Sequence, residues 1–305
     1  YRRHRERSLT ANLRPGTKFR VQFVGDMIDA IPVFYREELI ADAGSYSPSA
    51  GKPRAVVEAW RDARLPIDVR DVVPATVAEL AAAHDPEFVA GVLACRVANG
   101  FGNCRPEVAR SLPFTSGAML CAARHALAHG VACAPVSGFH HALYGSSGGY
   151  CTFNGLIVAA VRLLAEGQAR RVMILDADMH YGNGTDDIIE RLAISGQVAN
   201  VTLGRWFKTS AQAQQYLECI ERESARFHEF DLVLYQAGAD VHVDDPLGGV
   251  LTTEQMRVRD ETVFRAAKAA GVPLAWNLAG GYQQPLSIVV DLHTQTMREC
   301  VKVYV

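Results

Sequence analysis

The chain has 305 residues, of which 49% are hydrophobic and 21% are charged, and its formal net charge is −2. This length allows one large α/β domain with a buried core. A charge so close to zero gives no electrostatic attraction for nucleic acid or an anionic membrane, so we expect neither as a partner. The seven cysteines are never spaced as CxxC, which favours neither a disulfide framework nor a cysteine zinc site.

The sequence also bears on location and domain organisation. No apolar run approaches the roughly 20 residues that span a bilayer. The polar start, YRRHRERSLT, lacks the apolar core of a signal peptide. We therefore expect a cytoplasmic protein in which residues 1–18 form a flexible N-terminal segment and residues 19–305 form one domain.

The first part of the chain reads as one strand followed by helices. Alternating apolar positions predict a strand at 19–23. Helical periodicity then predicts helices at 55–64, 76–82, 88–95 and 115–129.

From residue 131 onward, short apolar runs alternate regularly with helical patterns. This alternation predicts an α/β fold with a central, mostly parallel sheet that helices cover on both faces. The strands are expected at 131–135, 172–175, 198–203, 231–237 and 273–278, and the helices at 154–166, 187–192, 211–227, 253–270 and 286–303.

The strand at 172–175 runs directly into polar side chains. Asp176, Asp178 and His180 follow at alternate positions. In an extended segment such residues share one face, so the three could converge on one point. Two carboxylates and a neutral imidazole suit a divalent metal such as zinc. Taken alone, the segment is also consistent with an ordinary polar loop at a strand end.

Three further polar clusters follow other predicted strands. His140-His141 comes after 131–135, GADVHVDDPLGG occupies 238–249, and AGGY ends at Tyr282. In a parallel sheet the carboxyl ends of the strands lie along one edge, where ligands bind. The coincidence of four such loops favours an active site at that edge.

These motifs together resemble a known family. DADMHYGNG, GFHHA followed by GGYCTFNG, GADVHVDDPLGG and AGGY, in this order and spacing, are similar to the zinc-dependent histone deacetylases, including bacterial deacetylase-like and acetylpolyamine amidohydrolase members. The resemblance implies a single-domain, three-layer arginase/deacetylase-like fold and a catalytic domain over 19–305. It implies a hydrolase that removes acetyl groups from acetyl-lysine or a related small acylated amine, with an acetylpolyamine-specific deacetylase as the alternative.

The resemblance also implies a metal site and an acid–base pair. Asp178, His180 and Asp245 would bind one zinc ion per chain, with iron(II) as an alternative. This ligand set leaves positions open for water and a substrate carbonyl. His141 would act as general base and acid on the metal-activated water, and His140 would be its electrostatic partner.

Other site residues follow from the same resemblance. Tyr282 would polarise the carbonyl and stabilise the oxyanion, and Asn183 would hold the second histidine without adding charge. Asp176 would support the first histidine and, with Thr202 and Leu203, would help to ligate a structural K⁺ or Na⁺ ion.

The acyl-lysine channel is implied at Gly149 and Tyr150, where Tyr150 replaces a more usual phenylalanine. The loop after residue 203 is short, so the resemblance does not identify the aromatic residue that forms the opposite wall of the channel. Asp240 is expected to satisfy backbone donors in its loop, and His242 is expected to be a solvated loop histidine rather than a fourth ligand.

Two competing functions remain to be weighed. A ureohydrolase with two manganese ions would need a D-A-H-x-D arrangement, whereas this chain has Asp178-Met179-His180 and a Gly-Gly-Tyr motif. A non-catalytic acyl-lysine binding module would not need the full catalytic set that is present. The expected partner is an acetylated lysine or small acetylated amine, and a homo-oligomer remains open.

Overall fold

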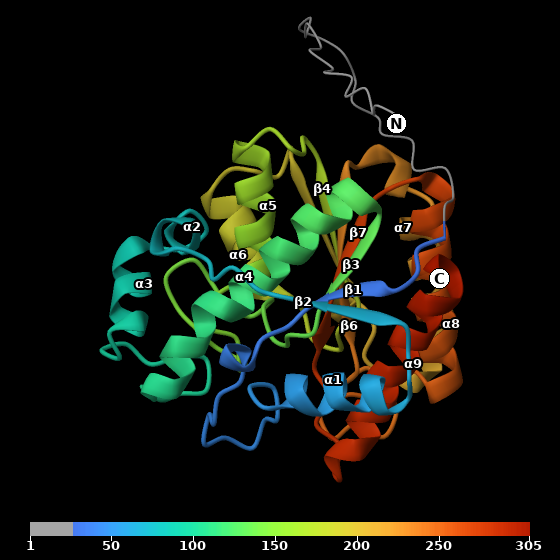
Figure 1. Ribbon diagram of the computed structural model, residues 1–305, viewed down its shortest axis with the longest axis horizontal. Helices are drawn as coiled ribbons and strands as arrows, with labels where there is room; N and C mark the ends of the chain where they lie inside the picture. Colours follow the sequence, from blue (N-terminus) through green and yellow to red (C-terminus); the bar gives the residue numbers. More distant parts are fainter. Residues whose placement is uncertain (1–26) are drawn as a thin grey trace, which may run out of the picture.

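A parallel sheet of seven strands forms the centre of the structure, a computed structural model that describes residues 27–305 (Figure 1). The strand order is β2-β1-β3-β7-β6-β4-β5, and every pairing between these strands is parallel. The predicted segment 1–18 and the predicted strand at 19–23 lie outside the described residues. The strands are β1 (Ile31–Phe34), β2 (Ile67–Arg70), β3 (Val131–Ala134), β4 (Val172–Asp176), β5 (Val198–Thr202), β6 (Leu232–Gly238) and β7 (Leu274–Ala279).

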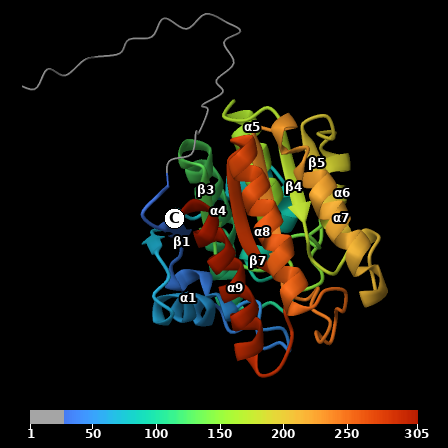
Figure 2. The ribbon, with the colours of Figure 1, turned by 90° about the vertical axis from the view of Figure 1, so that its right-hand side faces the viewer.

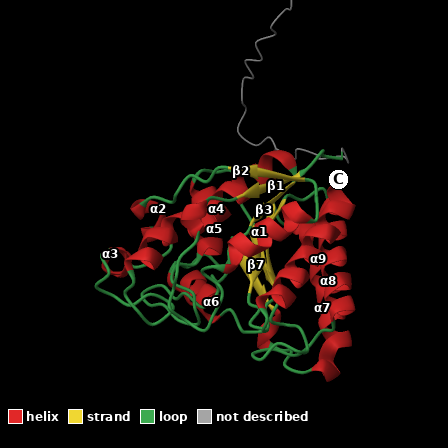
Figure 3. Cartoon of the chain, turned by 60° about the horizontal axis from the view of Figure 1, so that its bottom comes forward, coloured by secondary structure: helices red, strands yellow, loops and turns green. Residues whose placement is uncertain are grey.

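Helices cover both faces of this sheet, which confirms the predicted architecture. α7, α8 and α9 pack on one face, and α4 and α5 pack on the other (Figures 2 and 3). Within the described part of the chain, no helix combines the length and apolar character needed to cross a membrane. The helices are α1 (Lys52–Asp62), α2 (Val77–Ala81), α3 (Pro86–Leu93), α4 (Pro106–His129), α5 (Gly155–Ala165), α6 (Asn183–Arg191), α7 (Ala213–Ser224), α8 (Thr253–Ala270) and α9 (Leu286–Tyr304).

The largest differences from the sequence prediction are two additional strands and the start of α4, and other helices, such as α6, shift by a few residues at their ends. β1 and β2 were not predicted: each has four residues, and β1 contains Pro32, a residue that normally argues against a strand. α4 begins at Pro106 rather than at Thr115 and continues through Pro113. A proline at the first helical position costs no hydrogen bond, so Pro106 starts this helix well.

The sheet places polar side chains at its carboxyl end. β4 is wholly buried, as an apolar strand covered on both faces should be. Its last residue, Asp176, pairs in register with Thr202 of β5 and Gln236 of β6, and Gln236 pairs with Asn277 of β7. All four side chains are buried. A row of polar groups therefore crosses the sheet directly beneath the loops predicted to hold the site.

Candidate active site

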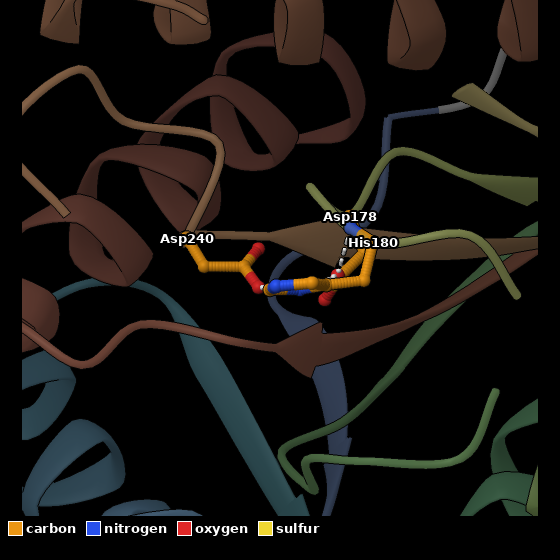
Figure 4. A group of neighbouring side chains, drawn as sticks. All are labelled: Asp178, His180 and Asp240. Atoms are coloured by element: carbon orange, nitrogen blue, oxygen red, sulfur yellow. Dashed lines mark hydrogen bonds and ion pairs between the residues drawn. The ribbon is translucent and has the colours of Figure 1, made fainter. Parts of the chain in front are cut away.

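The loop after β4 meets the loop after β6 in a cluster of three side chains. The His180 Nδ1 lies 3.2 Å from the Asp178 Oδ1 and 3.0 Å from the Asp240 Oδ2 (Figure 4). Among the described residues, these three form the one group whose ligand atoms all lie within 4.8 Å of one another. Two carboxylates and an imidazole are a donor set that suits zinc, so the residues fit a divalent metal.

Asp245, the third ligand implied by the sequence motif, lies on the same loop as Asp240 but outside that group of three. Its Oδ2 accepts a hydrogen bond from the Tyr282 N–H at 2.7 Å, and its Oδ1 accepts one from the Leu247 N–H at 2.9 Å. Asp240 accepts from the Met179 N–H at 3.2 Å, as expected of a residue that satisfies backbone donors. The assignment of Asp245 as a ligand therefore stays a prediction.

The ionisable groups of this cluster shift one another's pKa values. The hydrogen bonds that the Nδ1 of His180 can donate to Asp178 and Asp240 raise the pKa of His180 to about 10. Burial and the neighbouring Asp178 charge raise the pKa of Asp240 to about 7. Burial would also raise the pKa of Asp178, but His140 and His180 outweigh burial and lower it. Without a metal the carboxylates thus depend on protons for charge compensation, which a divalent ion could replace.

The first of the tandem histidines lies between two carboxylates. The His140 Nδ1 is 2.8 Å from the Asp176 Oδ2, and its Nε2 is 3.6 Å from the Asp178 Oδ1. Asp176 also accepts a hydrogen bond from the Gln236 Nε2 at 2.8 Å. Burial lowers the pKa of His140, but the charges of Asp176 and Asp178 outweigh burial and raise it to about 9. His140 is therefore a cation at neutral pH.

The second of the tandem histidines, His141, is neutral. The His141 Nδ1 is 2.7 Å from the Asn183 Oδ1, and the centroids of the two histidine rings are 4.1 Å apart. Burial and then the charge of His140 lower the pKa of His141 to about 4, so this ring is neutral at pH 7. Because an amide oxygen can only accept, the proton of His141 sits on Nδ1 and leaves Nε2 free to accept another.

The loop after β7 presents Tyr282 to the same region. Gly280 and Gly281 have φ angles of 49° and 92°, and a Cβ on Gly280 would overlap the Asp240 carboxyl group. These positions therefore require glycine. Tyr282 is buried, and its carbonyl accepts a hydrogen bond from the Tyr46 hydroxyl at 3.3 Å. Burial, with Asp240 and Asp178 nearby, raises the pKa of Tyr282, so its hydroxyl remains a hydrogen-bond donor.

The predicted channel residues lie against these catalytic candidates. Gly149 has a φ of 53°, and a Cβ there would overlap the ring of His141. The ring centroid of Tyr150 is 5.7 Å from that of Tyr282 and 5.9 Å from that of Phe101. The glycine brings backbone close to His141, while the tyrosine forms a wall beside Tyr282.

Two further predictions, one on a cation site and one on His242, have different outcomes. The Thr202 Oγ1 accepts a hydrogen bond from the Gly182 N–H at 2.9 Å, and Leu203 is buried beside it; their role at a monovalent cation, with Asp176, stays a prediction. His242 was expected to be solvated, and that expectation is wrong. Its side chain is buried because it lies between loops, with Nε2 2.9 Å from the Thr253 Oγ1 and Nδ1 3.2 Å from the Gln283 Nε2.

A cavity of about 950 Å³ opens beside Tyr282. Its lining combines the loop after β6, the loop after β7 and one side of α9 from Ile288 to Arg298. Among the lining residues are Tyr46, Asp244, Gln283 and Asp291. Of the candidate catalytic and channel residues, Tyr282 alone lines this cavity.

Sequence reasoning missed one buried charge near the site. Lys52, the first residue of α1, is wholly buried; its Nζ donates to the Gly280 carbonyl and lies 3.1 Å from the His293 Nε2. Burial lowers the pKa of Lys52 to about 8. A lysine at a helix start usually lies in solvent, so the sequence held no signal for this contact, which depends on the packing of α1 against α9.

Comparisons with known proteins agree with this geometry. The histone deacetylase domain matches residues 49–201 and 193–297. An uncharacterized protein from Picosynechococcus sp. is 29% identical over 249 residues, which cover 72% of this chain and 81% of that protein. The acetylpolyamine amidohydrolase of Mycoplana ramosa is 32% identical over 198 residues, so the match spans about half of each protein, 55% in both cases. The crystal structure of the HDA15 HD domain has the same fold, with a TM-score of 0.72 at 20% identity over 90% of this chain and 89% of that one.

Proposed function

The chain belongs to the histone deacetylase family, and we propose that it is a zinc-dependent amidohydrolase that removes acetyl groups from acetyl-lysine or a related small acylated amine. One observation carries this proposal. A cationic His140 and a neutral His141 lie beside the Asp178–His180 cluster and Tyr282. Amide hydrolysis needs a proton acceptor, an electrophile and a hydrogen-bond donor to the oxyanion. His141 would be the proton acceptor, a metal held by the cluster would supply the electrophile, and Tyr282 would be the hydrogen-bond donor.

We assign the metal to Asp178, His180 and Asp245, following the sequence motif, with Asp240 as the carboxylate that orients the His180 ring. The Asp240 Oδ2 lies 3.0 Å from the His180 Nδ1, close enough to hold the ring in place. When bound, a zinc or iron(II) ion supplies a Lewis acid that activates water and polarises the amide carbonyl.

Proton transfer is the work of His141. Its neutral ring offers Nε2 as the acceptor for the proton of the attacking water, and Asn183 holds Nδ1 in the required tautomer. As the carbon–nitrogen bond breaks, the same Nε2 returns this proton to the departing amine. The positive charge of His140, held by Asp176, keeps the pKa of His141 low and stabilises negative charge that develops nearby.

Tyr282 completes the site as a neutral donor. Its high pKa keeps the proton on the phenol oxygen, which can donate a hydrogen bond to the carbonyl oxygen as that oxygen becomes negative. Gly149 and Tyr150 would flank the aliphatic chain of the substrate. Acetyl-lysine and acetylpolyamines both present an acetamide on such a chain, and both fit this account.

A substrate panel tests the proposal. The full chain is stripped of metal, reloaded with zinc or iron(II), and assayed for acetate release from acetyl-lysine peptides, N-acetylputrescine and N-acetylspermidine. We expect metal-dependent release from at least one substrate class. Binding of acetylated amines without acetate release would instead identify a non-catalytic binding module, and two transition metals per chain would contradict the mononuclear site.

A further inference from the structure

A charged side chain lies on the buried face of α8. Arg259 is wholly buried, on the same helix face as Met256, Val263 and Phe264. A buried guanidinium is unfavourable unless hydrogen bonds and an opposite charge compensate for lost water. Its Nε contacts the Asp260 Oδ1 at 2.8 Å, and its Nη1 donates to the Gly238 carbonyl at 2.7 Å and the Ala177 carbonyl at 3.3 Å.

The two carbonyl groups belong to the segments that supply the metal cluster. Ala177 directly precedes Asp178, and Gly238 is the last residue of β6, two positions before Asp240. These segments touch, because a Cβ on Gly238 would overlap the backbone of Asp178. One guanidinium nitrogen thus joins the ends of β4 and β6 at the point where each leaves the sheet.

A second buried side chain fixes the same point from another helix. The hydroxyl of Tyr216, in α7, donates a hydrogen bond to the Ala177 carbonyl at 2.9 Å, and this tyrosine is almost fully buried. The Ala177 carbonyl, just beyond the end of β4, is therefore held from two directions. Neither Arg259 nor Tyr216 belongs to the candidate metal group, and the hydrogen bonds that join them to its two segments are made to backbone carbonyls.

We propose that Arg259 and Tyr216 are positioning residues that set the spacing of Asp178 and Asp240 around His180 by holding the Ala177 and Gly238 carbonyls. This inference rests on the proposed function, because the site it positions is the proposed metal centre. A guanidinium offers several donors in one plane and can bridge two carbonyls while paired with Asp260, which an ammonium cannot reproduce. Metal ligands tolerate only small displacements, so the expected effect is on metal affinity.

The same network contains a matched control. Tyr235 is also wholly buried, and its hydroxyl donates to the Asp260 Oδ1 at 2.5 Å rather than to a loop carbonyl. Asp260 additionally accepts from the Thr296 Oγ1 at 2.7 Å, so this side of the network ties α8 to α9. Removing the Tyr235 hydroxyl takes one donor from the Asp260 Oδ1, which the Arg259 Nε also contacts, but leaves both donors to the Ala177 carbonyl in place.

The experiment compares Tyr216→Phe with Tyr235→Phe in the full chain. Zinc affinity is measured by competition with a chromophoric chelator, and the free energy of unfolding by denaturant titration. We expect Tyr216→Phe to weaken zinc binding by about 10-fold, at the lower end of the effect of removing an outer hydrogen bond at a metal site. Tyr235→Phe should lose stability but keep the wild-type affinity. Equal affinities for both variants would overturn the proposal.

Arg259→Lys provides a second variant, which keeps the charge and loses the bridge between carbonyls. We expect it to weaken zinc binding more than Tyr216→Phe, and wild-type affinity would overturn the role of Arg259. If this variant does not fold, the comparison of Tyr216→Phe with Tyr235→Phe tests the proposal by itself. Wild-type protein that binds zinc but releases no acetate would refute the proposed function while leaving this comparison decisive. Wild-type protein that binds no zinc would overturn both.

Discussion

The Oδ2 of Asp240 lies 3.0 Å from the Nδ1 of His180, and both residues stand at the carboxyl end of the sheet on loops that follow neighbouring strands. Asp245, further along the loop of Asp240, instead accepts a hydrogen bond from the Tyr282 N–H. Two carboxylates are thus candidates for the third position around a metal at Asp178 and His180. Their roles can be separated by substitution.

We expect Asp245→Asn to lose zinc on dialysis, because it removes a charged ligand. Asp240→Asn should retain zinc with an affinity about 10–100-fold lower, as for a residue that orients a metal-bound histidine. Elemental analysis and chelator competition on both variants provide the measurement. The reverse order of affinities would identify Asp240 as the ligand and Asp245 as the support for Tyr282.

Removing the hydroxyl of Tyr282 should separate binding from chemistry. Tyr282→Phe keeps the ring, and with it the contact with Tyr150. We expect zinc content to be unchanged and kcat to fall about 10²–10³-fold, the usual effect of losing one oxyanion donor. Steady-state kinetics on the best acetylated substrate, with zinc analysis of the same sample, is the check. Unchanged turnover would refute the oxyanion role.

The charge on residue 183 should control the acidic limb of the pH profile. In the wild type the pKa of His141 is lowered to about 4, and that of His140 is raised to about 9. Between pH 4 and pH 9, His141 is therefore neutral while His140 is cationic. Asn183→Asp places a carboxylate against the Nδ1 of His141 and stabilises its protonated form, which raises the pKa of His141. The acidic limb of kcat/KM should then move to higher pH, and a limb that stays in place would contradict His141 as the base.

Gly149→Ala should disturb His141 directly. The new Cβ would overlap the histidine ring, and alanine at a φ of 53° costs about 1–2 kcal/mol in stability. We expect a loss of kcat together with a small loss of unfolding free energy. Gly102→Ala is the matched control, because Gly102 also has a positive φ, of 74°, but a Cβ there meets no atom within 4 Å. Equal effects of both variants on kcat would show that backbone strain, rather than the overlap with His141, causes the loss.

The sequence was informative wherever a local pattern determined local structure. The apolar run of β4 and the alternation of apolar runs with helical patterns after residue 131 are signals of this kind. They explain why the parallel sheet and the rim that carries the tandem histidines were predicted. β1 was missed because Pro32 interrupts its apolar run, and β2 was missed because it is a partly exposed edge strand with charged residues at two of its four positions.

Contacts that depend on tertiary packing were beyond sequence reasoning. The burial of Lys52 depends on α9, and that of His242 on two loops that meet only in the fold. Arg259 did leave a signal: an arginine and an aspartate occupy the apolar face of α8, where two charged residues require a partner. The spacing could flag that pair, but not the carbonyl groups it contacts.

The most direct test of the central claim is the product balance of the zinc-loaded chain. Acetate and free amine are quantified together after incubation with N-acetylputrescine and an acetyl-lysine peptide, with the chelated protein and Tyr282→Phe as controls. A zinc-dependent amidohydrolase should release acetate and amine in equal amounts over many turnovers, and both controls should be nearly inactive. Substrate binding without acetate from the zinc-loaded protein, or release that persists fully after chelation, would contradict the account.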